Sequence, residues 1–453
     1  MKLRNLLFGT MIACAFVACS NDDDPTPGPE VNPAELDATL TIAYQTDGAK
    51  SGLKSLSTKS IGTEVGATDA TIKKIGIAVF NKGAMSPAMA DGALISYREI
   101  DRTGVDTTAC VSAKSGDVEV MVIANPVSAD LTSLTTKTAF QEKVSEAALS
   151  SQINGNLLMT SPVYSLTLEK GRNVACSKTD ETDADKKFNW PDKDKTKFHN
   201  ATYKVYRNVA KITLRSIKID PREDFGKKAN YATFTLDSAY VDHVRSSVYV
   251  FGNNASEWNA VVNADAEKGF LTGLVDPAYT GTNYLLNKFT EGNSATYTGN
   301  ADNAVIGSTS KGELTSFYVF DNSAAAALAA GTATRLVLKG TYTYKTGNSG
   351  EDDVLESKHA YWYFDINPEG KDAGDAGYAA HFGVLRNMQY VVDATITGPG
   401  KGKDPQEPTT PPTDPDTPVT PPVNPDPDGG AACIKVKVDV VQWGTVYDRP
   451  SVD

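Results

Sequence analysis

Residues whose side chains could carry out catalysis are few and scattered in this sequence of 453 residues. The four histidines lie far apart, with no nucleophile or metal-ligand spacing around them: His199, His243, His359 and His381. No phosphate-binding loop, nucleophile elbow or metalloprotease helix motif occurs. The acidic run at 180–185 lacks the glycine and the closing glutamate that a calcium loop requires. The sequence therefore predicts a protein that is not an enzyme and that has no cofactor or metal site.

One cysteine stands in a context that predicts a covalent modification. A basic start with Lys2 and Arg4 is followed by a short apolar run at 6–17, and small residues then lead into Cys19. This order is typical of a lipoprotein signal, in which Cys19 becomes the acylated first residue of the mature chain. The apolar run is too short to span a bilayer as a stable helix, so we expect lipid to be the only attachment to a membrane.

The charge and the remaining cysteines narrow the classes of partner. A net charge of −12 argues against nucleic acid or an anionic membrane surface as the partner. Cys110, Cys176 and Cys433 have no Cys-x-x-Cys spacing, so neither a disulfide framework nor a zinc site follows. We expect isolated buried thiols, and the sequence leaves their role open.

Most of the chain shows the pattern of short β-strands. Alternating or β-branched runs are separated by clusters of Gly, Asn, Asp and Ser. The clearest runs are 75–80, 118–124, 201–214, 233–241, 334–344, 361–366 and 389–396. A short helix is expected from Ala139 onward, capped by Thr138. We expect a mainly β fold of two tandem antiparallel sandwiches, at 36–200 and 201–398, after a tether at 20–35.

The first strand of the first sandwich, 36–45, places its apolar residues on one face. These residues are Leu36, Ala38, Leu40, Ile42 and Tyr44. The following loop, 46–71, is rich in Gly, Ser, Thr and Ala and contains Lys50, Lys54 and Lys59. Exposed loops of small polar residues are preferred sites of proteolytic cleavage. A trypsin-like cut there would leave the first strand held by non-covalent contacts alone, and its departure would open an apolar groove between two unpaired strand edges.

A second unusual strand ends the chain, after a proline-rich linker at 399–432. Because prolines alternate there with Thr and Asp, we expect extended polyproline II, in which about 30 residues reach roughly 90–100 Å. The strand within 433–453 has an aliphatic face, and a change of phase near Val441 would turn a tryptophan onto it. The residues of this face are Ile434, Val436, Val438, Val440 and Trp443. A lone tethered strand is not stable in water, so it must dock, either within its own chain or, by strand addition, in the groove of another copy.

Five features together resemble the fimbrillins, the major shaft subunits of type V pili of Bacteroidales, and most of all those with a Pro/Asp/Thr-rich linker before the last strand. The features are the lipoprotein signal at Cys19, the strand 118–126, the entry to the second sandwich at 205–212, the segment 386–392, and the terminus 440–443. They span nearly the whole chain in order.

The resemblance implies two transthyretin-like sandwiches, export as a lipoprotein to the outer membrane, and incorporation into an extracellular fimbria that serves adhesion. It also implies removal of the first strand by a trypsin-like protease and exchange of the terminal strand between copies, with anchor and tip subunits as further partners. One departure concerns the cut, because no arginine occurs between Arg4 and Arg98. The cut would therefore follow a lysine, with Lys59 the first choice, then Lys54.

Two alternatives differ in role. A tip or anchor subunit would belong to the same family, but an anchor should lack the cleavable loop, and a tip need not donate a strand. A glycan-binding surface lipoprotein would instead gather exposed aromatic residues on one face. The tethered terminal strand favours a shaft subunit.

Overall fold

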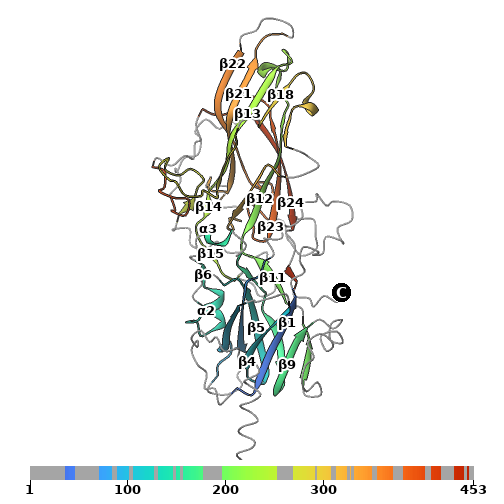
Figure 1. The fold of residues 1–453 in the computed structure, drawn as a ribbon, viewed down its shortest axis with the longest axis vertical. Helices are drawn as coiled ribbons and strands as arrows, with labels where there is room; N and C mark the ends of the chain where they lie inside the picture. Colours follow the sequence, from blue (N-terminus) through green and yellow to red (C-terminus); the bar gives the residue numbers. More distant parts are fainter. Residues whose placement is uncertain are drawn as a thin grey trace, which may run out of the picture.

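The protein is an elongated, mainly β molecule (Figure 1). Its computed structural model describes residues 36–45, 71–83, 89–101, 106–126, 131–145, 149–153, 157–176, 196–201, 203–251, 269–290, 293–307, 313–323, 327, 331–348, 355–370, 381–402, 410–419, 433–442 and 446–447. Two sheets built mainly from residues 38–207 form the lower half of the figure and are here the N-terminal sheet pair. Two sheets built from residues 210–442 form the upper half and are the C-terminal sheet pair.

The N-terminal sheet pair combines a four-stranded sheet with a larger one. The first has the order β10-β9-β1-β4, with β1 (Ala38–Gln45), β4 (Asp106–Ala113), β9 (Gly171–Cys176) and β10 (Thr196–Asn200). The larger sheet has the order β25-β11-β7-β5-β2-β3, and β8 also pairs with β5. Its strands are β2 (Lys74–Asn81), β3 (Leu94–Asp101), β5 (Gly116–Ala124), β7 (Met159–Thr160), β8 (Tyr164–Leu168), β11 (Lys204–Arg207) and β25 (Val446–Tyr447).

The C-terminal sheet pair contains two five-stranded sheets. One has the order β19-β12-β23-β24, with β20 also on β12, and the other has the order β17-β13-β21-β22, with β18 also on β13. The strands are β12 (Ala210–Ile219), β13 (Ala232–Asp242), β17 (Leu286–Lys288), β18 (Ser294–Tyr297), β19 (Val305–Gly307), β20 (Thr315–Val319), β21 (Arg335–Lys345), β22 (Leu355–Asp365), β23 (Met388–Ile396) and β24 (Ile434–Gln442). Two small ribbons pair β14 (Val244–Arg245) with β16 (Phe270–Leu271) and β15 (Val248–Tyr249) with β6 (Val144–Ser145).

The strand patterns of the sequence are confirmed, with one exception. The run 201–214 was expected to be one strand, but it is divided between β11 and β12, which belong to different sheets. The break falls at Asn208, whose side chain is fully buried and hydrogen-bonded. A mainly β fold with several sheets and few short helices is therefore what the chain adopts.

The expected helix forms, but it begins two residues earlier than the sequence pattern suggested. Helix α2 covers Lys137–Gln141, and it is capped by Thr136 rather than Thr138, because the Thr136 side chain accepts a hydrogen bond from the Ala139 amide at 3.1 Å. Only Phe140 of this helix is buried. The other short helices are α3 (Leu149–Gln152), η5 (Glu223–Phe225) and η7 (Ala301–Asn303). Among the described residues no helix combines the length and the apolar character needed to cross a membrane.

Two further expectations are corrected. The linker was expected to be an extended polyproline II segment, yet within its described part, 410–419, Pro412 and Pro415 are buried and a turn forms at 414–417. Isolated thiols were expected, but Cys110 is disulfide-bonded. Cys433 is free and half-buried.

Trp362 belongs to the core rather than to a sugar-binding surface. Its side chain is fully buried, its indole N–H donates to the Gly398 carbonyl at 3.0 Å, and its ring meets the Phe234 ring edge-on. The aromatic surface that a glycan-binding protein would need therefore cannot include this tryptophan.

Replacing Trp362 by alanine should lower the free energy of unfolding by about 3–5 kcal/mol, because the vacated volume cannot be refilled. Tyr361→Ala is the control, since this neighbouring side chain lies half-exposed on the other face of β22 and should cost about 1 kcal/mol or less. Denaturant unfolding monitored by far-UV circular dichroism, which reports on the backbone, measures the free energy of unfolding of both variants. Equal losses in the two variants would contradict the core placement.

Candidate functional site

The predicted first strand lies in the middle of its sheet. β1 pairs antiparallel with β4 over its whole length, from Ala38 opposite Ala113 to Gln45 opposite Asp106. On its other edge it pairs parallel with β9, from Ala38 to Ile42. β1 thus contributes to two hydrogen-bond ladders, and its removal would leave both β4 and β9 with an unpaired edge.

The apolar face of β1 is in the core, as expected from its alternation. Leu40 is 0% exposed, while Ala38 and Ile42 are each 1% exposed. Leu36 is partly buried against the same core. Tyr44 lies in β1, but its side chain is outside the described residues. Full burial of Leu40 and Ile42 is worth about 1.5–3 kcal/mol each, so non-covalent contacts alone hold this strand firmly.

The start of β1 is further tied to its neighbours by Asp37. Its carboxylate accepts hydrogen bonds from the Ser115 amide at 2.7 Å and from the Ser115 hydroxyl at 2.9 Å. Lys170 lies 3.5 Å from the same group. Partial burial alone would raise the pKa of Asp37, but the Ser115 hydrogen bonds and Lys170 outweigh it, so the pKa is lowered. These contacts stabilise the charged form and therefore stabilise the fold above the ordinary pKa of an aspartate.

A buried amide also contacts β1 from β9. The Asn173 side chain donates to the Thr39 carbonyl at 3.3 Å and to the Glu169 carbonyl at 2.8 Å. Its oxygen lies 2.9 Å from Nε2 of His199, a histidine on β10. Burial, and after it Lys197, lowers the pKa of His199, so its neutral form is favoured. This histidine supports the sheet around β1.

The terminal strand is docked on its own chain in this structure. β24 pairs antiparallel with β23, from Ile434 opposite Ile396 to Gln442 opposite Met388, with no change of register. The bulge expected near Val441 is therefore absent from the described strand. Val438 and Val440 are 7% and 9% exposed, while Ile434 and Val436 are only partly buried against the core. Trp443 lies outside the described residues.

Charges on the other face of β24 help to fix this register. Arg215 on β12 forms a bidentate ion pair with Asp393 on β23, and Asp393 also accepts from the Ser216 hydroxyl at 2.6 Å. Arg215 lies 3.7 Å from Asp439 of β24, and Lys437 lies 3.0 Å from the same carboxylate. Burial would raise the pKa of Asp393, but hydrogen bonds from Arg215 and Ser216 outweigh it and lower the pKa. β24 is thus aligned by apolar contacts on one face and by ion pairs on the other.

Two properties of β24 are unusual for a strand in this position. It lies at the edge of its sheet, so within the described residues only its β23 side has a ladder. The connection from β23 to β24 contains 37 residues, 397–433, although the two strands form a direct antiparallel pair. Such pairs are commonly joined by two to five residues. The length of this connection is therefore not needed to form the pair.

The end of the chain reaches the N-terminal sheet pair, which the sequence pattern did not reveal. β25 pairs antiparallel with β11, with Val446 opposite Val205 and Tyr447 opposite Lys204. β25 thereby forms the edge strand of the larger N-terminal sheet. Two residues are too few to give a strand signal in the sequence, so only the tertiary structure could identify this contact.

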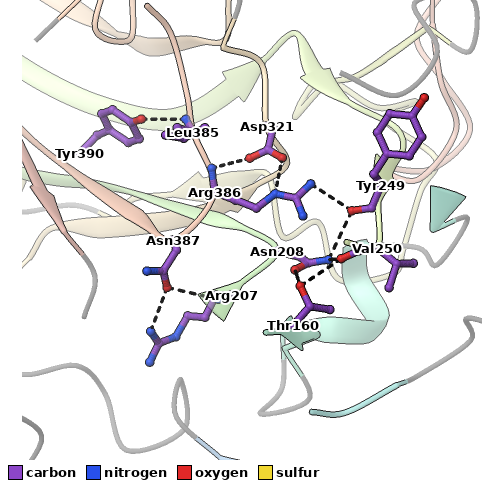
Figure 2. Close-up of polar contacts among 10 residues, drawn as sticks. All are labelled: Thr160, Arg207, Asn208, Tyr249, Val250, Asp321, Leu385, Arg386, Asn387 and Tyr390. Carbon is purple, nitrogen blue, oxygen red and sulfur yellow. Dashed lines mark hydrogen bonds and ion pairs between the residues drawn. The ribbon is translucent and has the colours of Figure 1, made fainter. Parts of the chain in front are cut away.

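A buried polar network joins the two halves of the molecule (Figure 2). Arg386 and Asp321, each with a side chain 1% exposed, form an ion pair with a distance of 2.6 Å between Nε and Oδ2. The Arg386 amide also donates to Asp321, and its Nη2 donates to the Tyr249 carbonyl at 3.0 Å. Burial raises the pKa of the Asp321 carboxyl, and Arg386 opposes that rise. Arg386 therefore links two segments of the C-terminal half through a charge that has little contact with water.

Asn208 extends this network to the N-terminal half. Its amide side chain donates to the Val250 carbonyl at 2.5 Å, and its oxygen accepts from the Thr160 hydroxyl at 3.2 Å. Its backbone N–H donates to the Leu158 carbonyl at 2.9 Å. Asn387, which has a positive φ of 57°, accepts from the Arg207 amide at 3.2 Å. The two segments that carried the family resemblance, 205–212 and 386–392, thus meet at this junction.

The remaining predicted site residues lie outside the described part of the chain. These are the lipidation candidate Cys19 and the cleavage candidates Lys50, Lys54 and Lys59. The described residues contain no cluster of three or more His, Cys, Asp or Glu side chains that could hold a metal ion.

Comparisons with known proteins agree with the fold and with the predicted family. Residues 38–205 match the family described as "Major fimbrial subunit protein (FimA)". The chain is 23% identical over 425 residues to the "Major fimbrium subunit FimA type-2" of Porphyromonas gingivalis, covering 90% of this chain and 94% of that protein. The chain is thus similar to FimA-type fimbrial subunits, in the family match over 38–205 and in the relative over most of its length. Both matches are described as fimbrial subunits, which agrees with the expectation of a structural protein that is not an enzyme.

Solved structures show the same fold over most of the chain. A putative cell adhesion protein from Parabacteroides distasonis has a TM-score of 0.58 and 19% identity, covering 93% of this chain and 100% of that one. A fimbrilin from Porphyromonas gingivalis has a TM-score of 0.51 and 16% identity, covering 91% and 99%. At these identities the likeness concerns the fold alone.

Replacing Arg386 by methionine should lower the free energy of unfolding by about 3–5 kcal/mol, because Asp321 would stay buried without its partner. Lys218→Met is the matched control, since Lys218 pairs with Asp302 at 2.6 Å on the surface. We expect no measurable change there. Thermal and denaturant unfolding measure both, and an equally small effect of the two substitutions would contradict the structural role of the junction.

Proposed function

We propose that the chain is a shaft subunit of a cell-surface fimbria and that it polymerises by donor-strand exchange. In this proposal β1 is removed after cleavage in the loop 46–71, and the terminal strand of another copy takes its place between β4 and β9. The chain would consist of two transthyretin-like sandwiches, the N-terminal and the C-terminal sheet pairs; the boundary expected at 200/201 moves to 208–209, because β11 (Lys204–Arg207) belongs to the N-terminal sheet pair. The similarity of the chain to FimA fimbrial subunits supports the assignment to a fimbria. The positions of β1 and β24 support the exchange mechanism.

The observation that carries the proposal is the difference between the two docking positions. In its own chain β24 lies at a sheet edge and pairs only with β23 in the described residues. The position of β1 offers ladders on both edges, with β4 and with β9. Ala38, Leu40 and Ile42 of β1 are at most 1% exposed, whereas Ile434 and Val436 of β24 remain partly exposed. A strand that moves from the first position to the second therefore gains a second ladder and buries more apolar surface.

The 37-residue connection before β24 is consistent with such a transfer. A short hairpin loop would hold β24 beside β23, but a long linker lets the strand leave while its chain remains attached. The second sandwich would then lose its edge strand, and β23 would become the edge. The terminal segment would lose its ladder with β23 and the two-residue ladder of β25 with β11, and it would gain ladders with β4 and β9. Each backbone hydrogen bond is worth about 0.5–1.5 kcal/mol net, so once β1 has left, the two ladders at its position favour the exchange.

Export and processing complete the proposed sequence of events. Cys19 would carry the lipid that holds the precursor on the outer membrane, and a trypsin-like protease would cut after Lys59, Lys54 or Lys50. The fibre would then be extracellular and serve adhesion and colonisation. The subunit would act with an anchor and a tip, and it is assigned to the shaft because it has both a cleavable loop and a terminal strand to donate.

The first test uses the protein without its signal peptide, treated with a trace of trypsin. We expect a detergent-resistant ladder whose subunits begin just after Lys54 or Lys59, and loss of the ladder when residues 434–453 are deleted. Gel electrophoresis and N-terminal sequencing measure both. A clean monomer that keeps β1 bound after the cut would contradict strand exchange.

Changing Lys50, Lys54 and Lys59 together to glutamine should give monomers with an intact first strand under the same treatment. The three lysines are the cleavage candidates, so the substitution removes the step that frees β1. Changing Lys73, Lys74 and Lys82 instead serves as the control, since these lysines follow the loop 46–71. Polymers from the first triple variant would discard the cleavage step.

Val438→Asp should abolish polymerisation, because a carboxylate would enter an apolar groove at a cost of several kcal/mol. Val438 is 7% exposed on the apolar face of β24 in its own chain, and in the proposed exchange the same face would enter the groove between β4 and β9. Lys437→Asp, on the exposed face, is the matched control and should still form the ladder. Fibres formed by Val438→Asp would show that this face does not dock in the groove.

A further inference from the structure

The proline-rich linker is attached to the body of the protein at its middle. Val419 forms a reciprocal pair of backbone hydrogen bonds with Phe270 of β16, at 2.9 and 2.8 Å. The Asp276 amide donates to the Pro412 carbonyl at 2.8 Å. Pro412 and Pro415 are buried. The Thr417 amide donates to the Asp414 carbonyl at 3.2 Å and closes a turn over 414–417. Residues 410–419 are here the anchor segment.

The surface that receives the anchor segment is fitted to it. Gly269 has a φ of +80°, and a Cβ at this position would lie 2.8 Å from the Val419 carbonyl oxygen. A glycine is therefore needed for Val419 to approach the backbone of β16 so closely. Phe270 is itself fixed, because its ring packs edge-on against His243 and lies 4.8 Å from the Arg245 guanidinium.

One carboxylate of the anchor segment connects both halves of the molecule. Asp416 accepts from the Tyr284 hydroxyl at 2.5 Å, and Tyr284 belongs to the C-terminal half. The other carboxylate oxygen of Asp416 accepts from the Ser150 hydroxyl at 2.5 Å, and Ser150 lies in α3 of the N-terminal half. Burial, with the bond to Asp416 next, raises the pKa of Tyr284, so this hydroxyl stays a donor. Asp416 thus spans the junction between the two halves.

We propose that the anchor segment remains docked while the terminal strand is exchanged, so that only residues 420–433 act as the arm that carries β24 to another copy. This inference rests on the proposed strand exchange and adds which part of the linker moves. The arm starts at Val419, beside β16, instead of at the end of β23.

The anchor changes how far the terminal strand can travel. The whole connection of 37 residues could span at most roughly 130 Å, whereas the 14 residues of the arm span at most roughly 50 Å. A shorter tether holds the strand at a higher effective concentration near its target, provided that it still reaches. The anchor segment would therefore limit the partners of β24 to an adjoining subunit and would set the distance between successive subunits.

A disulfide that locks the anchor tests this directly. Phe270 and Val419 form a hydrogen-bonded antiparallel pair. The Cα atoms of such a pair lie about 5.5 Å apart, which is a usual distance for two residues joined by a disulfide. The test protein carries Phe270→Cys and Val419→Cys together with Cys433→Ser, which removes the free thiol. The control carries only Phe270→Cys and Cys433→Ser, and thiol titration verifies the crosslink before trypsin is added.

We expect the oxidised, locked protein to polymerise at the same rate as its reduced form, because the arm has the same length and hence the same effective concentration in both. Electron microscopy should show the same subunit repeat for both. Polymerisation that is lost on oxidation and restored by reductant, with no such change in the control, would overturn the proposal that the anchor segment stays docked.

Hydrogen exchange of the unmodified protein gives a second readout if the locked variant does not fold. The Val419 and Phe270 amides should be as strongly protected in the fibre as in the monomer, and loss of protection in the fibre would overturn the anchor. The wild-type reaction runs in parallel. If wild-type protein forms no ladder, the strand exchange and the docked anchor segment both fail. A wild-type ladder, with a locked protein that folds but forms a ladder only after reduction, refutes the docked anchor segment alone.

Discussion

Which strand edges are covered, and by which segments, governs this structure. A strand at a sheet edge leaves a row of backbone donors and acceptors without protein partners, and it can pair with another chain. Here β1 fills the space between β4 and β9, β24 covers β23, and β25 covers β11. The first and the last strands of the described chain thus occupy the positions on which the closure of its sheets depends. A protein that assembles by strand exchange needs this arrangement, because the same ladders that complete the monomer can complete a neighbour.

The ladders alone would not keep the two halves in a fixed relation. The junction depends on buried polar groups, above all the Arg386–Asp321 pair and the Asn208 amide, which hold backbone carbonyls of distant segments. A buried ion pair contributes little net stability, but removal of one partner is costly, so it favours one arrangement over others. Asp416 of the linker adds a contact across the same junction, between Tyr284 and Ser150. A fibre subunit that transmits tension between neighbours would benefit from such a rigid connection.

Much of the fold could be predicted because strand patterns are local. The alternation at Leu36 to Tyr44 and at Ile434 to Val440 predicted β1 and β24, and β2, β5, β13, β21 and β23 follow the predicted runs to within one or two residues. The helix cap was placed two residues late, since Thr136 and Thr138 have equivalent side chains and only the backbone geometry distinguishes them. The break at Asn208 was missed, because a buried amide that ends a strand depends on carbonyls from other parts of the chain. The cleavage loop and Cys19 remain predictions.

The sequence by itself determined which segments form strands, which face of each is apolar, and that the chain resembles the fimbrillins. These properties are encoded in alternation and composition, which act over a few residues. Only the tertiary structure decided where those strands pair, that β1 has two ladders while β24 has one, that Cys110 is disulfide-bonded, and that the proline-rich linker is anchored at 410–419. Each of these depends on contacts between residues far apart in the chain. A polyproline pattern specifies a backbone conformation in isolation, but whether it packs depends on the surface that the rest of the fold presents to it.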